Sequence, residues 1–234
     1  MRNHHIHHVL TAFLVAIIAG GVFLVMHRAA AQTAATEPRL FITWRADTYA
    51  PAYFSGKLMP TGNSVVNASV GLFDDGRFVD LSMRQIYWYL NGEFAAGGVG
   101  LQRIYFRTPS RPGDVVALRA QLPDYRGKVI LKTISVPVVF PEAVIEAPAP
   151  IGKITGDSFL FFARPFFFNV KRFSDLVISW QINGQPPEFT TEPETLALDL
   201  TKTSSGATVG VALDMATPNR LFESGRKELF FVVE

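Results

Sequence analysis

From residue 39 onward, short runs in which every second residue is apolar follow one another, separated by turn-forming residues. Alternation with a period of two is typical of β-strands that bury one face. The pattern predicts strands at 40–45, 65–73, 85–90, 101–107, 114–122, 129–139, 157–163, 176–182, 195–200, 208–215 and 226–233. Because no stretch after residue 32 shows a convincing 3.6-residue period, we expect almost no helix there.

The pattern occurs twice. The segment 88–92 returns as 180–184, with tryptophan first and Asn-Gly last in both copies, roughly 92 positions later. The segment 132–138 returns as 227–233, roughly 95 positions later. Two markers at nearly one offset predict one structural unit used twice, and the unit has the size of an immunoglobulin-like sandwich, about 100 residues. Each Asn-Gly pair predicts a tight hairpin turn.

The repeat divides the chain. We expect residues 46–64 to form a loop, and the prolines of 140–150 to form a short, stiff connection that runs into the first strand of the second unit. The predicted organisation is an N-terminal anchor or signal peptide at 1–31, a linker at 32–38, a first sandwich at 39–141 and a second sandwich at 142–234.

The N-terminal segment has two interpretations. The run from Val9 to Met26 carries no charge and, as a helix of about 1.5 Å per residue, nearly matches a hydrocarbon core of about 30 Å. It is long for a secretory signal, which favours a retained single-pass anchor, whereas Ala29 to Ala31 supplies small residues for cleavage after Ala31. We expect the protein at the cell membrane with its β-domains outside the cytoplasm, or secreted if it is cleaved after Ala31.

Composition excludes several chemistries. The chain has no cysteine, and all five histidines precede residue 32, so a Ser-His-Asp triad, a Cys-His dyad and a His-ligated zinc site are impossible in the β-domains. Two of the 22 basic residues, Arg2 and Arg28, lie before residue 32 and none of the 20 acidic residues does, so the remainder is balanced. With no basic stripe we expect no nucleic-acid partner, and we expect no cofactor.

The chain resembles the broad bacterial class of immunoglobulin-like and PKD-like surface modules. Trp88 and Trp180 on a mid-unit strand, the Asn-Gly turns after them and the paired terminal strands carry the resemblance. It implies an all-β fold of two tandem immunoglobulin-like β-sandwiches with both tryptophans in the structural core, and the apolar run adds one N-terminal transmembrane or signal helix in front of them. The chain lacks the antibody-type cysteines and the usual PKD turn, and the resemblance transfers no functional residue.

A phenylalanine-rich stretch is the candidate contact surface. In a strand, Phe159 and Phe161 take one side and Leu160 and Phe162 the other, so both faces are apolar. The extra face suits contact with the other unit, a partner or the membrane surface; the alternative is a locally thick core in which Pro165 turns the chain. The residues of the predicted partner contact are Phe159, Phe161, Phe162, Phe166, Phe167 and Phe168.

Other clusters favour ordinary structure. Asp74, Asp75 and Asp80 surround a glycine, but their spacing matches no standard calcium loop and favours a solvated turn. The glycines of 95–100 lack a following helix and lysine, which favours a flexible strand connection over a phosphate loop. Carboxylates considered for glycoside hydrolysis, without a spacing that singles out any two, are Glu93, Asp114, Asp124 and Glu188.

Taken together, the sequence favours a non-enzymatic, extracytoplasmic structural or interaction protein, membrane-anchored or exported. We expect a protein partner in the cell envelope, where the chain would be an accessory subunit of an assembly. The alternative is a carbohydrate-binding or adhesive module for a wall polymer, carried by Tyr87 and Tyr89 on the strand face opposite Trp88.

Overall fold

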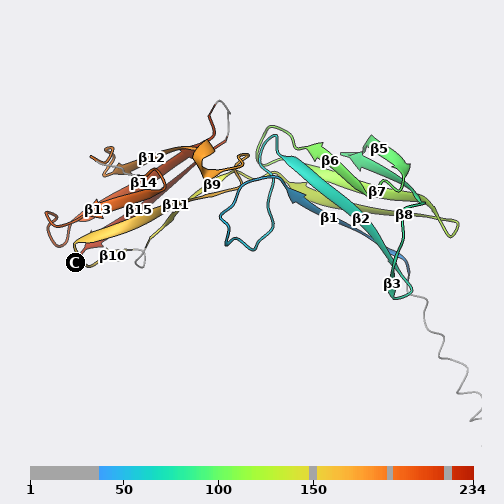
Figure 1. Ribbon diagram of the computed structural model, residues 1–234, viewed down its shortest axis with the longest axis horizontal. Helices are drawn as coiled ribbons and strands as arrows, with labels where there is room; N and C mark the ends of the chain where they lie inside the picture. The colour runs from blue at the N-terminus through green and yellow to red at the C-terminus, as the bar shows by residue number, and fades with distance from the viewer. Residues whose placement is uncertain (1–36, 148–151, 189–191, 219–222) are drawn as a thin grey trace, which may run out of the picture.

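The computed structural model describes residues 37–147, 152–188, 192–218 and 223–234. The predicted anchor or signal segment, Val9 to Met26, therefore lies outside the described residues. Within the described ranges no helix has the length and apolar character needed to cross a membrane. The two β-sandwiches lie end to end along the longest axis of the molecule (Figure 1).

The first sandwich consists of two antiparallel sheets. In one sheet β2 pairs with β1, β3 and β6, and the other has the order β5-β4-β7-β8. The strands are β1 (Arg39–Ala46), β2 (Val65–Asp74), β3 (Arg77–Val79), β4 (Gln85–Leu90), β5 (Glu93–Val99), β6 (Arg103–Arg107), β7 (Val115–Tyr125) and β8 (Lys128–Pro137). Alternate residues of these strands face a buried cluster between the sheets, which includes Trp88.

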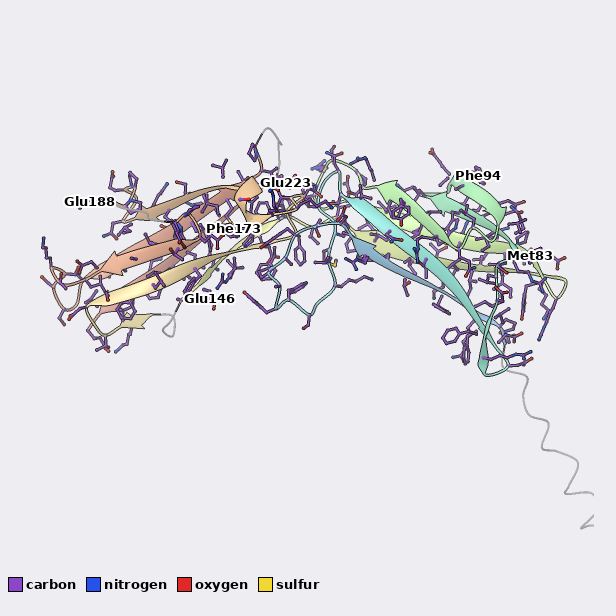
Figure 2. All side chains as sticks on the ribbon, in the orientation of Figure 1. Met83, Phe94, Glu146, Phe173, Glu188 and Glu223 are labelled. Carbon is purple, nitrogen blue, oxygen red and sulfur yellow. The ribbon has the colours of Figure 1, made fainter. Side chains whose placement is uncertain are left out.

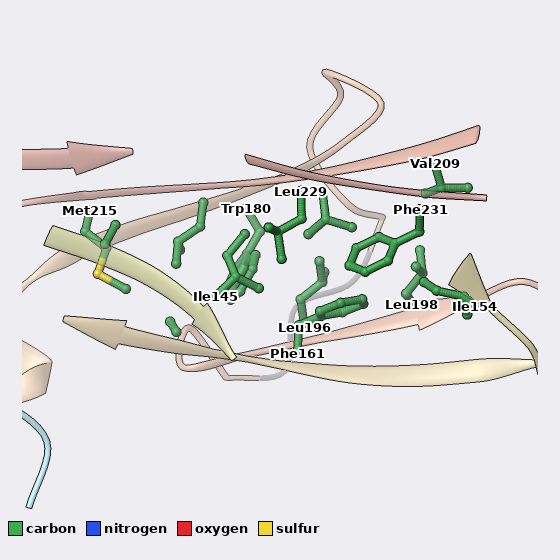
Figure 3. Close-up of a cluster of buried hydrophobic side chains, with 14 of the residues drawn as sticks. Ile145, Ile154, Phe161, Trp180, Leu196, Leu198, Val209, Met215, Leu229 and Phe231 are labelled. Carbon is green, nitrogen blue, oxygen red and sulfur yellow. The ribbon is translucent and has the colours of Figure 1, made fainter. Parts of the chain in front are cut away.

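The second sandwich repeats this arrangement, with sheets in the order β13-β11-β9 and β10-β15-β14-β12. Its elements are β9 (Glu142–Glu146), β10 (Lys153–Ile154), β11 (Ser158–Phe166), a 3-10 turn η1 (Phe173–Asp175), β12 (Val177–Ile182), β13 (Thr195–Asp199), β14 (Thr208–Ala216) and β15 (Ser224–Val233). Figure 3 shows its core, where Phe161, Trp180 and Phe231 lie between the two sheets.

Strand order defines the class of fold. In each unit the second strand of one sheet lies between the first and a later strand, and the two C-terminal strands pair beside the strand that carries the tryptophan. This is the arrangement of an immunoglobulin-like sandwich. The predicted fold class, all-β with two tandem immunoglobulin-like sandwiches, is therefore confirmed for the described residues.

Both tryptophans occupy the same position in their sandwich. Trp88 has none of its surface exposed and its indole Nε1 donates a hydrogen bond to the Leu101 carbonyl at 2.8 Å. Trp180 is 3% exposed and donates to the Pro193 carbonyl at 3.1 Å. A buried indole needs such a partner, and each finds it on the chain segment that follows its hairpin.

The two Asn-Gly turns are built alike as well. Asn91 and Asn183 have positive φ angles of 51° and 49°, a conformation that asparagine tolerates better than most residues. Each side-chain oxygen accepts a hydrogen bond of 2.8 Å from a backbone N–H of the next long strand, that of Ala117 for Asn91 and that of Gly210 for Asn183. The turns thereby tie the tryptophan strand to its neighbour in both sandwiches.

Some sequence expectations were wrong at the sheet edges. Residues 95–100, expected to be a flexible connection, lie largely in β5, because Gly97 leaves room for the Tyr87 ring: a Cβ there would be 2.5 Å from a ring carbon. Strand β9 occupies part of the stiff connection expected at 140–150 and pairs with β11. The short strands β3 and β10 carry too few residues for alternation to reveal them.

Candidate functional site

The phenylalanine-rich stretch divides between the two faces of β11. Phe159 and Phe161 face the core, and Phe161 is fully buried. Leu160, 43% exposed, and the half-buried Phe162 face outward, where the Arg164 guanidinium lies 4.9 Å from the centre of the Phe162 ring. Phe161 therefore offers no surface to a partner in this conformation, and Phe162 and Leu160 provide what apolar surface β11 presents.

The end of the stretch contacts the first sandwich. Phe166 and Phe167 pack edge-on against Phe54, with ring centres 5.5 and 5.8 Å apart. Phe168 is fully buried, and its carbonyl accepts a 2.8 Å hydrogen bond from the Tyr49 N–H, while the Phe167 N–H donates to the Tyr49 carbonyl at 2.7 Å. Of the three partners considered for this stretch, the other sandwich is the one that the described residues show.

We call the contact between the 47–64 loop and residues 166–171 the joint. In Figure 1 this loop lies between the two sandwiches. Tyr49 packs against the core of the second sandwich, although it belongs to the first. Burial raises the pKa of the Tyr49 phenol, nearby Glu194 of the second sandwich adds to this, and Arg164 opposes it. An exposed ion pair joins Asp47 to Lys171 at 2.5 Å.

A polar network lies beneath this contact. The Asn169 side chain donates to the Gly62 carbonyl at 2.8 Å and accepts from the Ser64 hydroxyl at 2.7 Å, so it bridges the sandwiches. Its backbone N–H donates to the carboxylate of Glu223, a buried residue that lies at the joint in Figure 2. The Thr108 hydroxyl accepts from the Ser64 N–H at 2.9 Å. Ser64, Thr108 and Glu223 are buried and Asn169 is half-buried, and because these polar groups are paired with one another the joint tolerates few alternative arrangements.

An open hollow of about 580 Å³ adjoins the joint. Residues of the 47–64 loop, among them Tyr49 and Lys57, line it together with Val170 and Lys171 of the second sandwich. Both sandwiches thus contribute to one concave surface, and its shape depends on the joint staying as it is.

The predicted glycan-contact residues belong to an aromatic cluster on the outer face of the β5-β4-β7-β8 sheet. Tyr87 and Tyr89 are half-buried and point away from the core that holds Trp88. Their rings pack edge-on against exposed Phe94, with centres 6.3 and 5.9 Å apart. The Arg119 guanidinium stacks 3.9 Å from the centre of the Tyr89 ring. The sheet therefore carries a continuous aromatic surface edged by a cation.

The aspartates of the β2–β3 turn do not converge. Asp74 is buried and accepts a hydrogen bond from the Tyr125 hydroxyl at 2.6 Å, with Arg126 at 2.9 Å. Asp75 pairs with the same Arg126, and Asp80 accepts two hydrogen bonds from its neighbour Ser82. Among the described residues no group of three His, Cys, Asp or Glu side chains is placed to hold a metal ion. The expected solvated turn was wrong for Asp74, whose partners on β7 and beyond draw it inside.

The four scattered carboxylates lie on different segments of the fold. Glu93 begins β5, Asp114 precedes β7 and Asp124 lies near the end of β7. Glu188 belongs to the second sandwich and is exposed. A glycosidase needs two such groups on opposite sides of one bond, and these positions do not define such a pair.

Comparison with known proteins gives no family. No family model matches the chain, and no curated protein matches its sequence. Among solved structures it is similar to the fibronectin(III)-like modules of Clostridium thermocellum CbhA, with 10% identity over 83% of this chain and 94% of that chain and a TM-score of 0.31. It is also similar to the tandem Ig repeats of Dlar, with 12% identity over 84% of this chain and 97% of that chain and a TM-score of 0.28. A third similar structure contains three N-terminal domains of the Hoc protein of bacteriophage RB49, with 10% identity over 84% of this chain and 70% of that chain and a TM-score of 0.30. These scores are low, and the fold rests on this chain's own strand pairing.

Sequence reasoning missed the joint. Asn169 and Ser64 stand out by neither spacing nor composition, since Asn169 is one polar residue after an apolar run and Ser64 ends an ordinary polar stretch before a strand. A usable signal was the length of the 46–64 loop, because a loop of that size in a small sandwich is commonly functional or packs on something. Tyr49 and Phe54, aromatic residues inside that loop, pointed the same way.

Proposed function

We propose that this protein is a non-enzymatic, extracytoplasmic spacer and interaction protein, an accessory subunit of a cell-envelope assembly held or exported by its N-terminal segment. The joint is the observation that carries the proposal. Two sandwiches connected by a flexible linker would move independently. Here a two-way backbone contact at Tyr49 and the half-buried hydrogen bonds of Asn169 hold them in one arrangement.

A fixed arrangement of the two sandwiches suits the presentation of a binding surface to a partner better than it suits catalysis. Loops of the second sandwich lie at the far end of the molecule from β3, so a partner would meet them at a set distance and angle (Figure 1). Within the predicted partner contact, we propose the outer face of β11 as the surface that a partner meets. On this strand Leu160 pairs with Ala197, and Phe162 pairs with Thr195 and Glu146. Phe162, with its stacked Arg164, is the centre of this surface.

Site-specific photo-cross-linking of the full chain in its native cells tests this proposal. A photoreactive residue replaces Phe162, and a matched control replaces Phe230, which is exposed on the outer side of β15. We expect one protein, recovered in near-equal amount, to be linked at position 162 and absent at position 230. Phe162→Ser should abolish its recovery without unfolding the chain. Identical products from both positions, or none from either, would contradict the proposed contact.

A second candidate function is binding of a wall polysaccharide. The aromatic cluster of Tyr87, Tyr89 and Phe94 favours it, because sugar rings stack on exposed aromatic faces and the Arg119 guanidinium suits an acidic or hydroxyl-rich saccharide. Co-sedimentation of the full chain with purified wall polymer tests it. Binding should be lost in Tyr87→Ala/Tyr89→Ala and kept in Tyr105→Ala, an exposed tyrosine on the other sheet. Equal binding by all three proteins would rule the cluster out.

A further inference from the structure

Two exposed apolar side chains lie at one end of the first sandwich. Met83 is 83% exposed and Phe78 is 74% exposed, the highest values among the large apolar side chains of the described residues. Phe78 is held in place, because its ring packs edge-on against Phe41 and Phe73 with centres 5.9 and 5.4 Å apart. Met83 lies at the end of the first sandwich away from the joint (Figure 2). Large apolar side chains exposed to this degree at one end of a domain are typical of a contact surface.

The chain enters the fold at the same end. Arg39, the first residue of β1, pairs with Phe73 beside the β2–β3 turn, and Glu37 and Pro38 line a hollow together with Asp74. The uncharged run that ends at Met26 is therefore separated from this end only by residues 27–36. Even fully extended, that segment spans at most about 35 Å. A membrane that holds the run is within reach of Phe78 and Met83.

Two arginines border the apolar pair. Arg77 precedes Phe78 and Arg84 follows Met83 in the sequence, and both arginines line one hollow of about 400 Å³. Among the described residues neither arginine has an ion-pair partner; Arg84 only lies over the ring of Tyr125, at 5.6 Å. Their guanidinium groups are thus available to an outside anion.

The acidic residues nearby have other partners than Arg77 and Arg84. Arg126 pairs with both Asp74 and Asp75, and Asp80 accepts hydrogen bonds from the N–H and hydroxyl of Ser82. Asp80 keeps its negative charge, so positive and negative groups balance around this hollow, but Arg77 and Arg84 have no ion-pair partner among the described residues and flank the exposed apolar side chains in the sequence. Exposed apolar side chains bordered by arginines match a phospholipid surface, where phosphate groups lie over a hydrocarbon layer.

We propose that this end of the first sandwich docks on the phospholipid surface of the membrane that holds the N-terminal segment. Phe78 and Met83 enter the boundary between headgroups and acyl chains, and Arg77 and Arg84 bind lipid phosphates. This inference rests on the membrane tether in the proposed function. Docking would add to the joint in fixing the second sandwich at a set height above the bilayer.

Because the chain has no cysteine, a single introduced cysteine provides a unique position for a polarity-sensitive fluorophore. The full chain is labelled at Met83→Cys or, as a matched control, at Ser204→Cys, an exposed position in the β13–β14 loop near the C-terminal end. Each protein is added to phosphatidylcholine vesicles with and without phosphatidylglycerol. We expect a blue shift and a gain of emission at position 83, strongest with phosphatidylglycerol, and no change at position 204. Phe78→Ser and Arg77→Gln/Arg84→Gln should each reduce the shift.

Flotation of the same vesicles separates this inference from the tether. A chain that floats while position 83 stays in water overturns the docking and leaves the tether standing. A chain that does not float, yet shifts at position 83 when vesicles are present in excess, supports docking without a tether. Equal shifts at positions 83 and 204 would overturn the docking, because they would report general adsorption.

Discussion

The two sandwiches share one framework and differ at their edges. In both, a tryptophan strand, an Asn-Gly turn and two C-terminal strands form the same sheet, and the tryptophans face equivalent partners, Ala120 on β7 and Leu213 on β14. After its turn the first sandwich adds β5 to this sheet, whereas the second extends the sheet on the other side with β10. The strands that the two copies share follow from the sequence repeat, and the two copies differ in the strands at the edges of their sheets.

Proline explains one of these differences. Pro186 and Pro187 follow the second Asn-Gly turn at the place where the first copy continues into β5. Proline cannot donate a ladder hydrogen bond, so this segment cannot pair as β5 does. The first sandwich thereby gains the support for its aromatic cluster, since Phe94 and Gly97 both lie in β5. A comparable cluster is not to be expected on the second copy.

The largest expected effects test whether the tryptophans are equivalent. Trp88→Ala and Trp180→Ala should each lower the free energy of unfolding by about 3–5 kcal/mol, because each removes a buried indole from a closed core. Chemical denaturation gives the loss. Hydrogen exchange locates it, with β4 and β7 less protected in the first variant and β12 and β14 in the second.

Phenylalanine at the same positions serves as the control, since it keeps most of the ring and loses the bond to the Leu101 or Pro193 carbonyl. Its cost should be clearly smaller than that of alanine at both sites. A tryptophan that alanine replaces at little cost would break the equivalence of the two copies.

Asn169→Ala tests whether the copies act as one body. It should lower the free energy of unfolding by about 1–3 kcal/mol, because the buried Ser64 hydroxyl loses its acceptor and the Gly62 carbonyl loses its donor. It should also broaden the distance between spin labels at Met83→Cys and Ser204→Cys, measured by pulsed electron paramagnetic resonance. An unchanged, narrow distance distribution would show that the backbone contact at Tyr49 suffices to hold the joint.

Tyr125→Phe sharpens the comparison by acting on the first sandwich. The hydrogen bond to Asp74 raises the pKa of the Tyr125 phenol; burial adds to this and Arg126 opposes it. The unfolded chain, with a tyrosine pKa of about 10, loses this proton first. The bond therefore contributes fully below pH of about 10, and its contribution falls as pH rises through the folded-state pKa.

We expect Tyr125→Phe to lose about 1–3 kcal/mol near neutral pH and to show a shallower fall in stability in alkali than the native chain. Urea midpoints from pH 8 to pH 11 measure both effects (roughly the range around the tyrosine pKa). Parallel curves for the two proteins would mean that Tyr125 does not titrate differently on unfolding.

The smallest effect concerns the exposed side of the joint. Asp47→Asn removes the ion pair with Lys171, whose side chains are 61% and 72% exposed, and should cost less than about 1 kcal/mol. Denaturation in low and high salt measures it, with the difference from the native chain shrinking as salt rises. A loss as large as that of Asn169→Ala would move the main support of the joint from its interior to its surface.

The strands of both frameworks were predictable because their alternation is local. Strand β4 was predicted at its observed bounds, and the face shared by Val116 and Leu118 in the first copy matches that of Val209 and Val211 in the second. The aromatic stretch was only half predictable. Its alternation showed that both sides of β11 are apolar, and it could not show that the far end of the stretch would meet Phe54.

The sequence by itself determined that this chain is all-β, that one sandwich occurs twice, and that no histidine or cysteine chemistry is open to the β-domains. Those properties follow from composition and from periods of two residues, which each segment carries alone. Only the tertiary structure decided that Asp74 is drawn inside by Tyr125, that Asn169 bridges the sandwiches, and which apolar side chains remain exposed. Burial and hydrogen bonding depend on neighbours that are distant in the sequence, and the folded chain alone brings them together.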